Sequence, residues 1–248
     1  MKTSNHLLRR LTAALLAAVL ALSIALPVFA SDDGDTIYIN SVSDLLSLAK
    51  SCAYDQWSVG KTVILQKDLS LEGMLWEPIP SFSGQFKGNG HTISDLTITG
   101  QYSPAGLFGI VEEQGSIESL SVRGIVSVSD SADTTTGGIV GINHGTLINC
   151  QFTGVVTGDS EVGGIVGRNE SEGTIDHSTA RAIVTGKSST GGIAGYNLGA
   201  ITGCTNVGSI NTEYQEASLD TDGFTAKMVD YINNKMAAAD DDVTNSVT

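Results

Sequence analysis

The chain has few of the residues on which several common protein classes depend. Only 13 Lys and Arg oppose 27 Asp and Glu, and the 248 residues include just 4 His, 4 Pro and 3 Cys. An acidic surface of this kind repels nucleic acid and anionic membranes, so neither is expected as a partner. The His-Glu-x-x-His pattern of a zinc peptidase helix is absent as well, and no metal or cofactor is expected.

The first thirty residues have the order of a secretory signal peptide. Three basic residues precede an apolar run over residues 11–26, and Val28-Phe29-Ala30 supplies small residues for cleavage. We therefore predict that residues 1–30 are removed, that the mature chain is secreted or held at the cell surface, and that no membrane span remains. The mature chain keeps 10 basic residues against 27 acidic ones, a formal charge of 10 − 27 = −17.

Four similar segments indicate a repetitive fold. Each reads Gly-apolar-apolar-Gly, and they begin at Gly106, Gly138, Gly164 and Gly192. The spacing between successive starts drifts from the mid-twenties to the low thirties. A period of this length is typical of a solenoid in which outer loops absorb the differences.

Aligning the residues that follow each start gives three columns of mostly apolar side chains. They are Ile117, Leu147, Ile175 and Ile201; Leu120, Cys150, Ser178 and Cys204; and Val126, Val156, Val184 and Ile210. Polar and apolar residues alternate around Leu120-Ser121-Val122, which is typical of a strand, and the three-residue step before it requires a bend. Apolar residues do not recur at helical steps, so a helical repeat is rejected.

The segment 90–100 aligns in the same way, with Ile93, Leu96 and Ile98 on the columns of Ile117, Leu120 and Val122. This alignment makes five coils. We predict an all-β fold, a right-handed parallel β-helix (solenoid) with an N-terminal capping helix and a short C-terminal helix.

The expected organisation has three parts after the signal peptide. Residues 31–60 hold a strand and the capping helix, because Ser41 with Asp44 resembles a capping box. One apolar stripe of that helix would contain Val42, Leu45, Leu46, Ala49 and Ala53. The β-helix then covers 61–212, with repeats starting near 106, 138, 164 and 192. An acidic tail spans 213–248, and apolar residues every four positions indicate its helix over 223–238.

Glycine and asparagine recur at fixed places in the repeats. Glycine at both ends of each Gly-apolar-apolar-Gly segment would allow positive φ at the corners and close approach between coils. The asparagines that follow by two residues could hydrogen-bond to one another along the stack. The predicted structural turn and ladder residues are Gly138, Gly141, Asn143, Gly164, Gly167, Asn169, Gly192, Gly195 and Asn197.

The cysteine count is odd, so at least one of Cys52, Cys150 and Cys204 cannot pair within the chain. Cys150 and Cys204 share a column, but Ser178 lies between them. Two coils at ~4.8 Å each put their Cα atoms ~9.6 Å apart, beyond the ~7 Å that a disulfide spans. We expect three reduced thiols.

The repeats Gly137-Gly138-Ile139-Val140-Gly141-Ile142-Asn143, 163–169 and 191–197 resemble the GLUG motif, and the stretch from Trp76 to Ile93 is similar to the segment that usually precedes it. The resemblance covers roughly residues 36–212. It implies a bacterial, secreted or surface-attached β-helix, often the first part of a larger adhesin-like or multidomain protein, including some immunoglobulin A peptidases. The chain departs from fuller members by ending soon after its third Gly-Gly repeat, so a truncated member or spacer is one interpretation.

The leading hypothesis for function is a noncatalytic, adhesin-like module that contacts a host or cell-surface protein or glycan. No catalytic residue is assigned, and the ligand-binding residues are unknown. The alternative is a carbohydrate-active lyase or hydrolase, which needs converging carboxylates or a basic residue. Its candidate groups are Glu118, Asp176, Arg123 and Arg181, with Ile148 between the two carboxylates.

Overall fold

The structure is a computed structural model that describes residues 35–54, 56–128 and 134–211. The predicted signal peptide (1–30), acidic tail (213–248) and C-terminal helix (223–238) lie outside the described residues.

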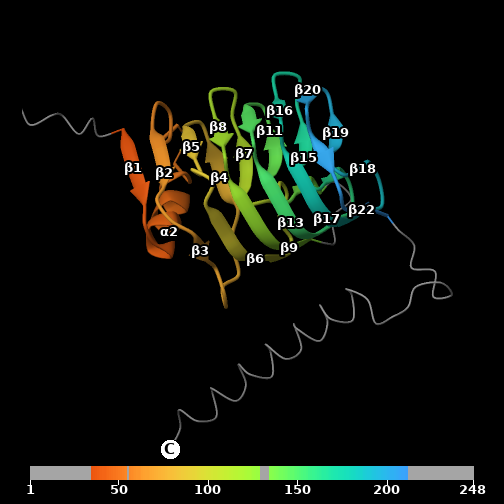
Figure 1. The fold of residues 1–248 in the computed structure, drawn as a ribbon, viewed down its shortest axis with the longest axis horizontal. Coiled ribbons are helices and arrows are strands. Elements are labelled where there is room, and N and C mark those ends of the chain that lie inside the picture. The colour runs from red at the N-terminus through yellow and green to blue at the C-terminus, as the bar shows by residue number, and fades with distance from the viewer. Residues whose placement is uncertain (1–34, 55, 129–133, 212–248) are drawn as a thin grey trace, which may run out of the picture. The chain divides into compact units, whose positions relative to one another are not determined.

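The described chain folds into a parallel β-helix of about six coils, as the sequence predicts. A complete coil contains four short strands, each of which pairs with the corresponding strand one coil earlier and one coil later. The strands therefore form four parallel sheets along the stack, and Figure 1 shows their regular progression from β1 to β22. Every contact across a sheet joins residues about one repeat apart.

The sheets are named A to D. Sheet A contains β1 (Thr36–Ile39), β2 (Thr62–Leu65), β5 (Gln85–Lys87), β8 (Ser116–Glu118), β12 (Thr146–Ile148), β16 (Thr174–Asp176) and β20 (Ala200–Thr202). Sheet B contains β3 (Leu69–Ser70), β6 (Thr92–Gly100), β9 (Ser121–Val128), β13 (Gln151–Thr157), β17 (Thr179–Thr185) and β21 (Thr205–Asn206), and β22 (Ser209–Ile210) also pairs with β17. Sheet C contains β4 (Ile79–Phe82), β7 (Phe108–Val111), β11 (Val140–Asn143), β15 (Val166–Asn169) and β19 (Ala194–Asn197). Sheet D contains β10 (Thr136–Gly137), β14 (Val162–Gly163) and β18 (Thr190–Gly191).

The predicted columns of the later coils are confirmed. Leu147 pairs with Ile117 and Ile175, and Val156 pairs with Val126 and Val184. All six of these side chains are fully buried. The two-residue alternation of the strands therefore places one apolar residue of each coil directly above the next.

The predicted alignment of segment 90–100 is wrong. Ile93 pairs with Val122 rather than lying over Ile117, and Ile98 pairs with Val126. Phe86 takes the place over Ile117. The register shifts between Ile93 and Leu96, where one extra residue is accommodated and Asp95 has a φ of 59°. The three-residue step from Ile93 to Leu96 is thus a bulge within sheet B, not the bend between sheets A and B. The five coils expected from the sequence are therefore fewer than the about six coils of the structure.

Helix α2 (Val42–Ser51) is confirmed near the N-terminus. The Ser41 hydroxyl accepts a hydrogen bond from the Asp44 N–H at 3.2 Å, and the Asp44 carboxylate accepts one from the Asn40 N–H at 2.9 Å. These bonds satisfy N–H groups that a helix start leaves free. The helix packs against β1 and β4, so it covers the free edge of sheet C.

The predicted stripe of α2 is only partly right. Leu45 is buried as expected, but Leu48 and Cys52 are the other buried residues of this face. Leu46 is 42% exposed and Ala53 is exposed too. The helix therefore packs Leu45, Leu48 and Cys52 against the core. Leu46, Ala49 and Ala53 form the neighbouring side of the helix, here called the 46/49/53 face.

Three aromatic rings pack together in the core of the first coils. Phe82, Phe86 and Phe108 are buried, with ring centroids 5.4 to 6.3 Å apart. Trp76 is buried beside them, and its indole N–H donates to the Leu107 carbonyl at 3.2 Å. In the next coils smaller side chains take two of these places, with Ile117 paired to Phe86 and Val140 paired to Phe108.

Candidate functional site

The three predicted ladder asparagines lie in one column of sheet C. The Asn143 side-chain amide donates to the Asn169 side-chain oxygen at 2.7 Å, and Asn169 donates to Asn197 at 2.8 Å. Each asparagine also donates to a carbonyl of the bend that follows it, those of Gly145, Gly173 and Gly199. Asn143 and Asn169 are completely buried, so these groups hold the bend and do not face a ligand.

The predicted turn glycines act through close packing and not through positive φ. None of Gly138, Gly141, Gly164, Gly167, Gly192 and Gly195 has a positive φ. A Cβ at Gly138 would collide with the Phe152 ring, and one at Gly164 would collide with the Gly192 carbonyl oxygen. A left-handed residue instead recurs at the bend between sheets A and B, as Ser119, Asn149, His177 and Gly203.

The candidate groups of a sugar-cleaving site are not brought together. Glu118 and Asp176 lie on sheet A, with Ile148 paired between them. Arg123 and Arg181 lie on sheet B, with Thr153 paired between them. The carboxylates are thus separated by a coil, and the guanidinium groups belong to a different sheet.

The histidines that the structure describes are partnered or line a surface groove. His177 pairs with Asp176 at 2.9 Å, and His91 pairs with Asp68 at 3.2 Å. The pKa of the Asp68 carboxyl is lowered because the Thr92 N–H and His91 both donate to it. Within the described ranges, no three His, Cys, Asp or Glu side chains are placed to hold a metal ion.

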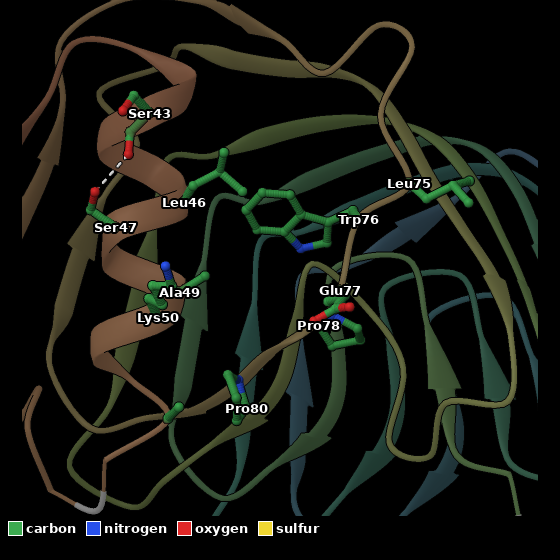
Figure 2. Close-up of a pocket in the computed structure, with 11 residues that line it drawn as sticks. Ser43, Leu46, Ser47, Ala49, Lys50, Leu75, Trp76, Glu77, Pro78 and Pro80 are labelled. Carbon is green, nitrogen blue, oxygen red and sulfur yellow. Dashed lines mark hydrogen bonds between the residues drawn. The ribbon is translucent and has the colours of Figure 1, made fainter.

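One apolar groove lies beside α2. Its volume is about 580 Å³, and one wall is the 46/49/53 face of the helix. Figure 2 shows Leu46 directed towards the Trp76 indole, with Leu75 and Pro78 on the opposite wall. Leu75 is 72% exposed. Sequence reasoning missed this groove, because it took Leu46 as part of the core-facing stripe.

Two further grooves are polar. One of about 560 Å³ is lined by Glu112, Glu113 and His144 among others, and Ser81 donates to Glu112 at 2.7 Å. The other, of about 350 Å³, lies at the start of sheet B and includes Asp68, Thr92 and Arg123. The second opens onto the outer surface of β6 and β9.

The outer surface of sheet B, here called the sheet B face, presents four straight columns of side chains. They are Thr92, Ser121, Gln151, Thr179 and Thr205; Arg123, Thr153 and Arg181; Thr97, Ile125, Val155, Ile183 and Ser209; and Thr99, Ser127, Thr157 and Thr185. None of these residues is buried. Hydroxyl, amide, guanidinium and aliphatic groups therefore recur at the ~4.8 Å spacing of neighbouring strands. Figure 1 shows β6, β9, β13 and β17 lying side by side.

Comparison with known families gives one match in the middle of the stack. Residues 158–185, which include β14, β15, β16 and β17, match the family model described as the GLUG motif. Residues 158–185 carry a GLUG motif. The resemblance drawn from its Gly-Gly-Ile-Val-Gly-x-Asn segments is thereby confirmed, and the GLUG asparagine is the ladder residue of sheet C.

Two relatives are similar to part of the chain. Halomucin of Haloquadratum walsbyi is 36% identical over 155 residues, which cover 57% of this chain and 2% of halomucin. A protein of Evansella cellulosilytica, named as a Gly-rich membrane protein, is 30% identical over 137 residues, which cover 40% of this chain and 16% of that protein. The chain thus spans less than a fifth of the length of either relative.

One solved structure is similar at low identity. It is named as an immunoglobulin A1 protease from Bacteroides ovatus and matches with a TM-score of 0.44 and 15% identity, covering 75% of this chain and 80% of that chain. Among the residues that the structure describes, no helix has the length and apolar character needed to cross a membrane.

Proposed function

We propose that this chain is a noncatalytic, secreted or cell-surface β-helix module that contacts a protein or glycan through the sheet B face. The observation that carries the proposal is the arrangement of that face. Four columns of accessible side chains run across consecutive strands, and each column repeats similar hydrogen-bonding or aliphatic groups. An extended ligand with its own repeat can contact such a surface at several points.

Because the sheet B face is rigid, a ligand can bind to it without a conformational change of the protein. Its central strands β6, β9, β13 and β17 are paired on both sides, and their inward residues, such as Val122, Phe152 and Val184, are fully buried. Side chains on rigid strands lose less conformational freedom on binding than those on loops, which favours affinity. The names of the two relatives, a mucin and a membrane protein, also support a place at the cell surface.

The rival function, cleavage of a polysaccharide, receives less support from the geometry. Glu118 and Asp176 do not converge, since Ile148 lies between them. A pair of carboxylates flanking one glycosidic bond is the usual requirement of a hydrolase.

The proposal is tested with the mature chain on arrays of immobilised glycans and extracellular proteins. We expect binding that Thr153→Glu with Thr157→Glu on the sheet B face reduces at least tenfold. The matched control is Thr146→Glu with Ile148→Glu, which adds the same charge to sheet A and should leave binding unchanged. Equal loss in both variants would contradict the assigned face, and new reducing ends or unsaturated sugars in the same incubations would refute the noncatalytic role.

A further inference from the structure

The sheet B face carries two arginine side chains in a protein with few basic residues. Arg123 of β9 and Arg181 of β17 are exposed, and the register pairs each of them with Thr153 of β13. The two arginines therefore stand in one column, two strands apart. At ~4.8 Å between neighbouring strands their Cα atoms are ~9.6 Å apart. The face thus presents two positive charges at a fixed separation.

The third arginine of the described chain has a different environment. Arg168 of sheet C forms ion pairs with the carboxylates of Glu161 and Glu170. Among the described residues, no carboxylate forms an ion pair with Arg123 or Arg181. A guanidinium without such a partner on the protein is open to a carboxylate of a ligand, and its planar fork can hold both oxygens of that group.

The surroundings of the two arginines on the sheet B face are uncharged. The other outward residues of β9, β13 and β17 carry hydroxyl, amide or aliphatic groups. The mature chain as a whole has a formal charge of −17, from 10 basic and 27 acidic residues. An anionic ligand is therefore attracted to this part of the surface and repelled by the acidic rest of the protein, which fixes where such a ligand binds.

Negative charge lies at the first strands of sheet B. Asp68 lines the same groove as Arg123, and its carboxylate accepts hydrogen bonds from the Thr92 N–H at 2.9 Å and from the His91 ring at 3.2 Å. These two donors, with a smaller contribution from the charge of Arg123, lower the pKa of the Asp68 carboxyl. Asp68 is thus held by its own partners, and its charge limits an anionic ligand to β9 and the strands that follow.

The separation of the arginines discriminates among linear anionic polymers that run across the strands. An extended polypeptide repeats its side chains on one side every two residues, or ~6.6 Å, which matches neither one strand spacing nor two. One pyranose of an extended glycan advances its chain by a distance close to one strand spacing, so two sugars span the column from Arg123 to Arg181. Beside this column, Gln151 can donate to and accept from sugar hydroxyls, and Val155 can contact the C–H groups of the ring.

We propose that the sheet B face binds an acidic linear polysaccharide with one carboxylate on every second sugar, and that Arg123 and Arg181 bind successive carboxylates. The inference rests on the proposed function and names its ligand class. Thr153 lies opposite the intervening neutral sugar, and its hydroxyl accepts a hydrogen bond from the Gln151 side chain at 3.3 Å.

Titration of the complete mature chain with hyaluronan, a polymer with this alternation, tests the proposal. We expect saturable binding that weakens as salt is added, and binding at least about fivefold weaker for Arg123→Gln and for Arg181→Gln. The control Lys87→Gln removes one exposed positive charge from sheet A and should leave the affinity unchanged. Carboxyl-reduced hyaluronan has the same backbone without the charge and should not bind.

A variant of unchanged net charge tests the spacing. Thr153→Arg combined with Arg181→Thr keeps two guanidinium groups in the column but places them one strand apart, so both face the same carboxylate. We expect binding of hyaluronan to weaken at least about fivefold. The circular dichroism spectrum and melting temperature should stay the same, because both positions face outward.

Three results would overturn the inference. Equal binding of hyaluronan by the spacing variant would mean that net charge, and not the register, selects the ligand. Equal or tighter binding of polyglutamate or single-stranded DNA would assign the two arginines to another class of polymer. If hyaluronan does not bind, but a neutral glycan or a protein does and is lost in Thr153→Glu with Thr157→Glu, the ligand class is wrong and the proposed function stands. If nothing binds to this face, both fail.

Discussion

The Ser178 hydroxyl accepts a hydrogen bond from the backbone N–H of Cys150, one coil earlier, at 3.1 Å. The Ser178 N–H in turn donates to the Cys204 sulfur at 3.4 Å. Ser178 therefore lies between the two cysteines of its column, as the repeat alignment predicts. The thiols belong to coils that are two apart, and all three cysteines of the described chain are free.

Thiol titration follows from this arrangement. The mature protein, unfolded in denaturant without reductant, should react at three thiols. In the native protein Cys204 should react first, because it is only partly buried, while Cys52 and Cys150 are buried. A count of one would mean an internal disulfide and would contradict the column.

Alkaline pH should destabilise the fold through Cys150. Burial raises the pKa of this thiol from 9.0 to about 12, so the folded chain keeps a proton that the unfolded chain loses above 9.0. Stability from this group is complete below 9.0 and declines as the pH rises towards about 12. Thermal melting at increasing pH measures the effect. Cys150→Ser, which copies the side chain of Ser178, should melt with a weaker dependence on alkaline pH, and an unchanged dependence would argue against this assignment.

Charge should be tolerated on one side of β16 and not on the other. Ile175 is completely buried, whereas Asp176 is partly exposed and pairs with His177 at the surface. Ile175→Asp should cost several kcal/mol out of a stability of about 5–15 kcal/mol, because it buries an unpaired carboxylate. Asp176→Ile should cost under about 1 kcal/mol, since surface ion pairs contribute little. Denaturant unfolding compares the two variants, and similar midpoints would mean that the register is wrong.

The columns from Ile117 onwards could be predicted because inward apolar residues recur at constant offsets from each Gly-apolar-apolar-Gly segment. The earlier coils could not, because the bulge at Asp95 imitates the three-residue step of a bend. Arg123 and Arg181 could be named from the sequence as candidate groups, but their alignment with Thr153 on the sheet B face follows from the register of the strands. The groove beside Trp76 did not follow, because it depends on how α2 is rotated against β4, which no local pattern encodes.

The asparagine ladder should weaken more at its middle than at its end. Asn169→Ala leaves the buried Asn143 amide without its acceptor, and also removes the donor to Gly173 and Asn197. We expect a loss of about 2–3 kcal/mol, because unpaired buried polar groups carry a desolvation penalty. Asn197→Ala is the comparison. It takes one acceptor from the Asn169 amide, which keeps the Gly173 carbonyl, and Asn197 itself is exposed, so the loss should be about 1 kcal/mol or less. If urea unfolding gives the same loss of unfolding free energy for Asn169→Ala and Asn197→Ala, the buried asparagines do not contribute more stability than the exposed one.

The location of α2 in the first coil bears on how the chain is built during synthesis. A polypeptide that leaves the ribosome or the membrane channel starting from its N-terminus exposes β1, α2 and β2 before any later strand exists. Strand β4, against which α2 also packs, follows after β2 and β3, so the covered end of the stack is complete once the first 82 residues have emerged. Because each coil contacts only its neighbours, every newly emerged repeat meets a finished edge on which to fold. Assembly can then advance in the same direction as translation, without waiting for distant segments to arrive.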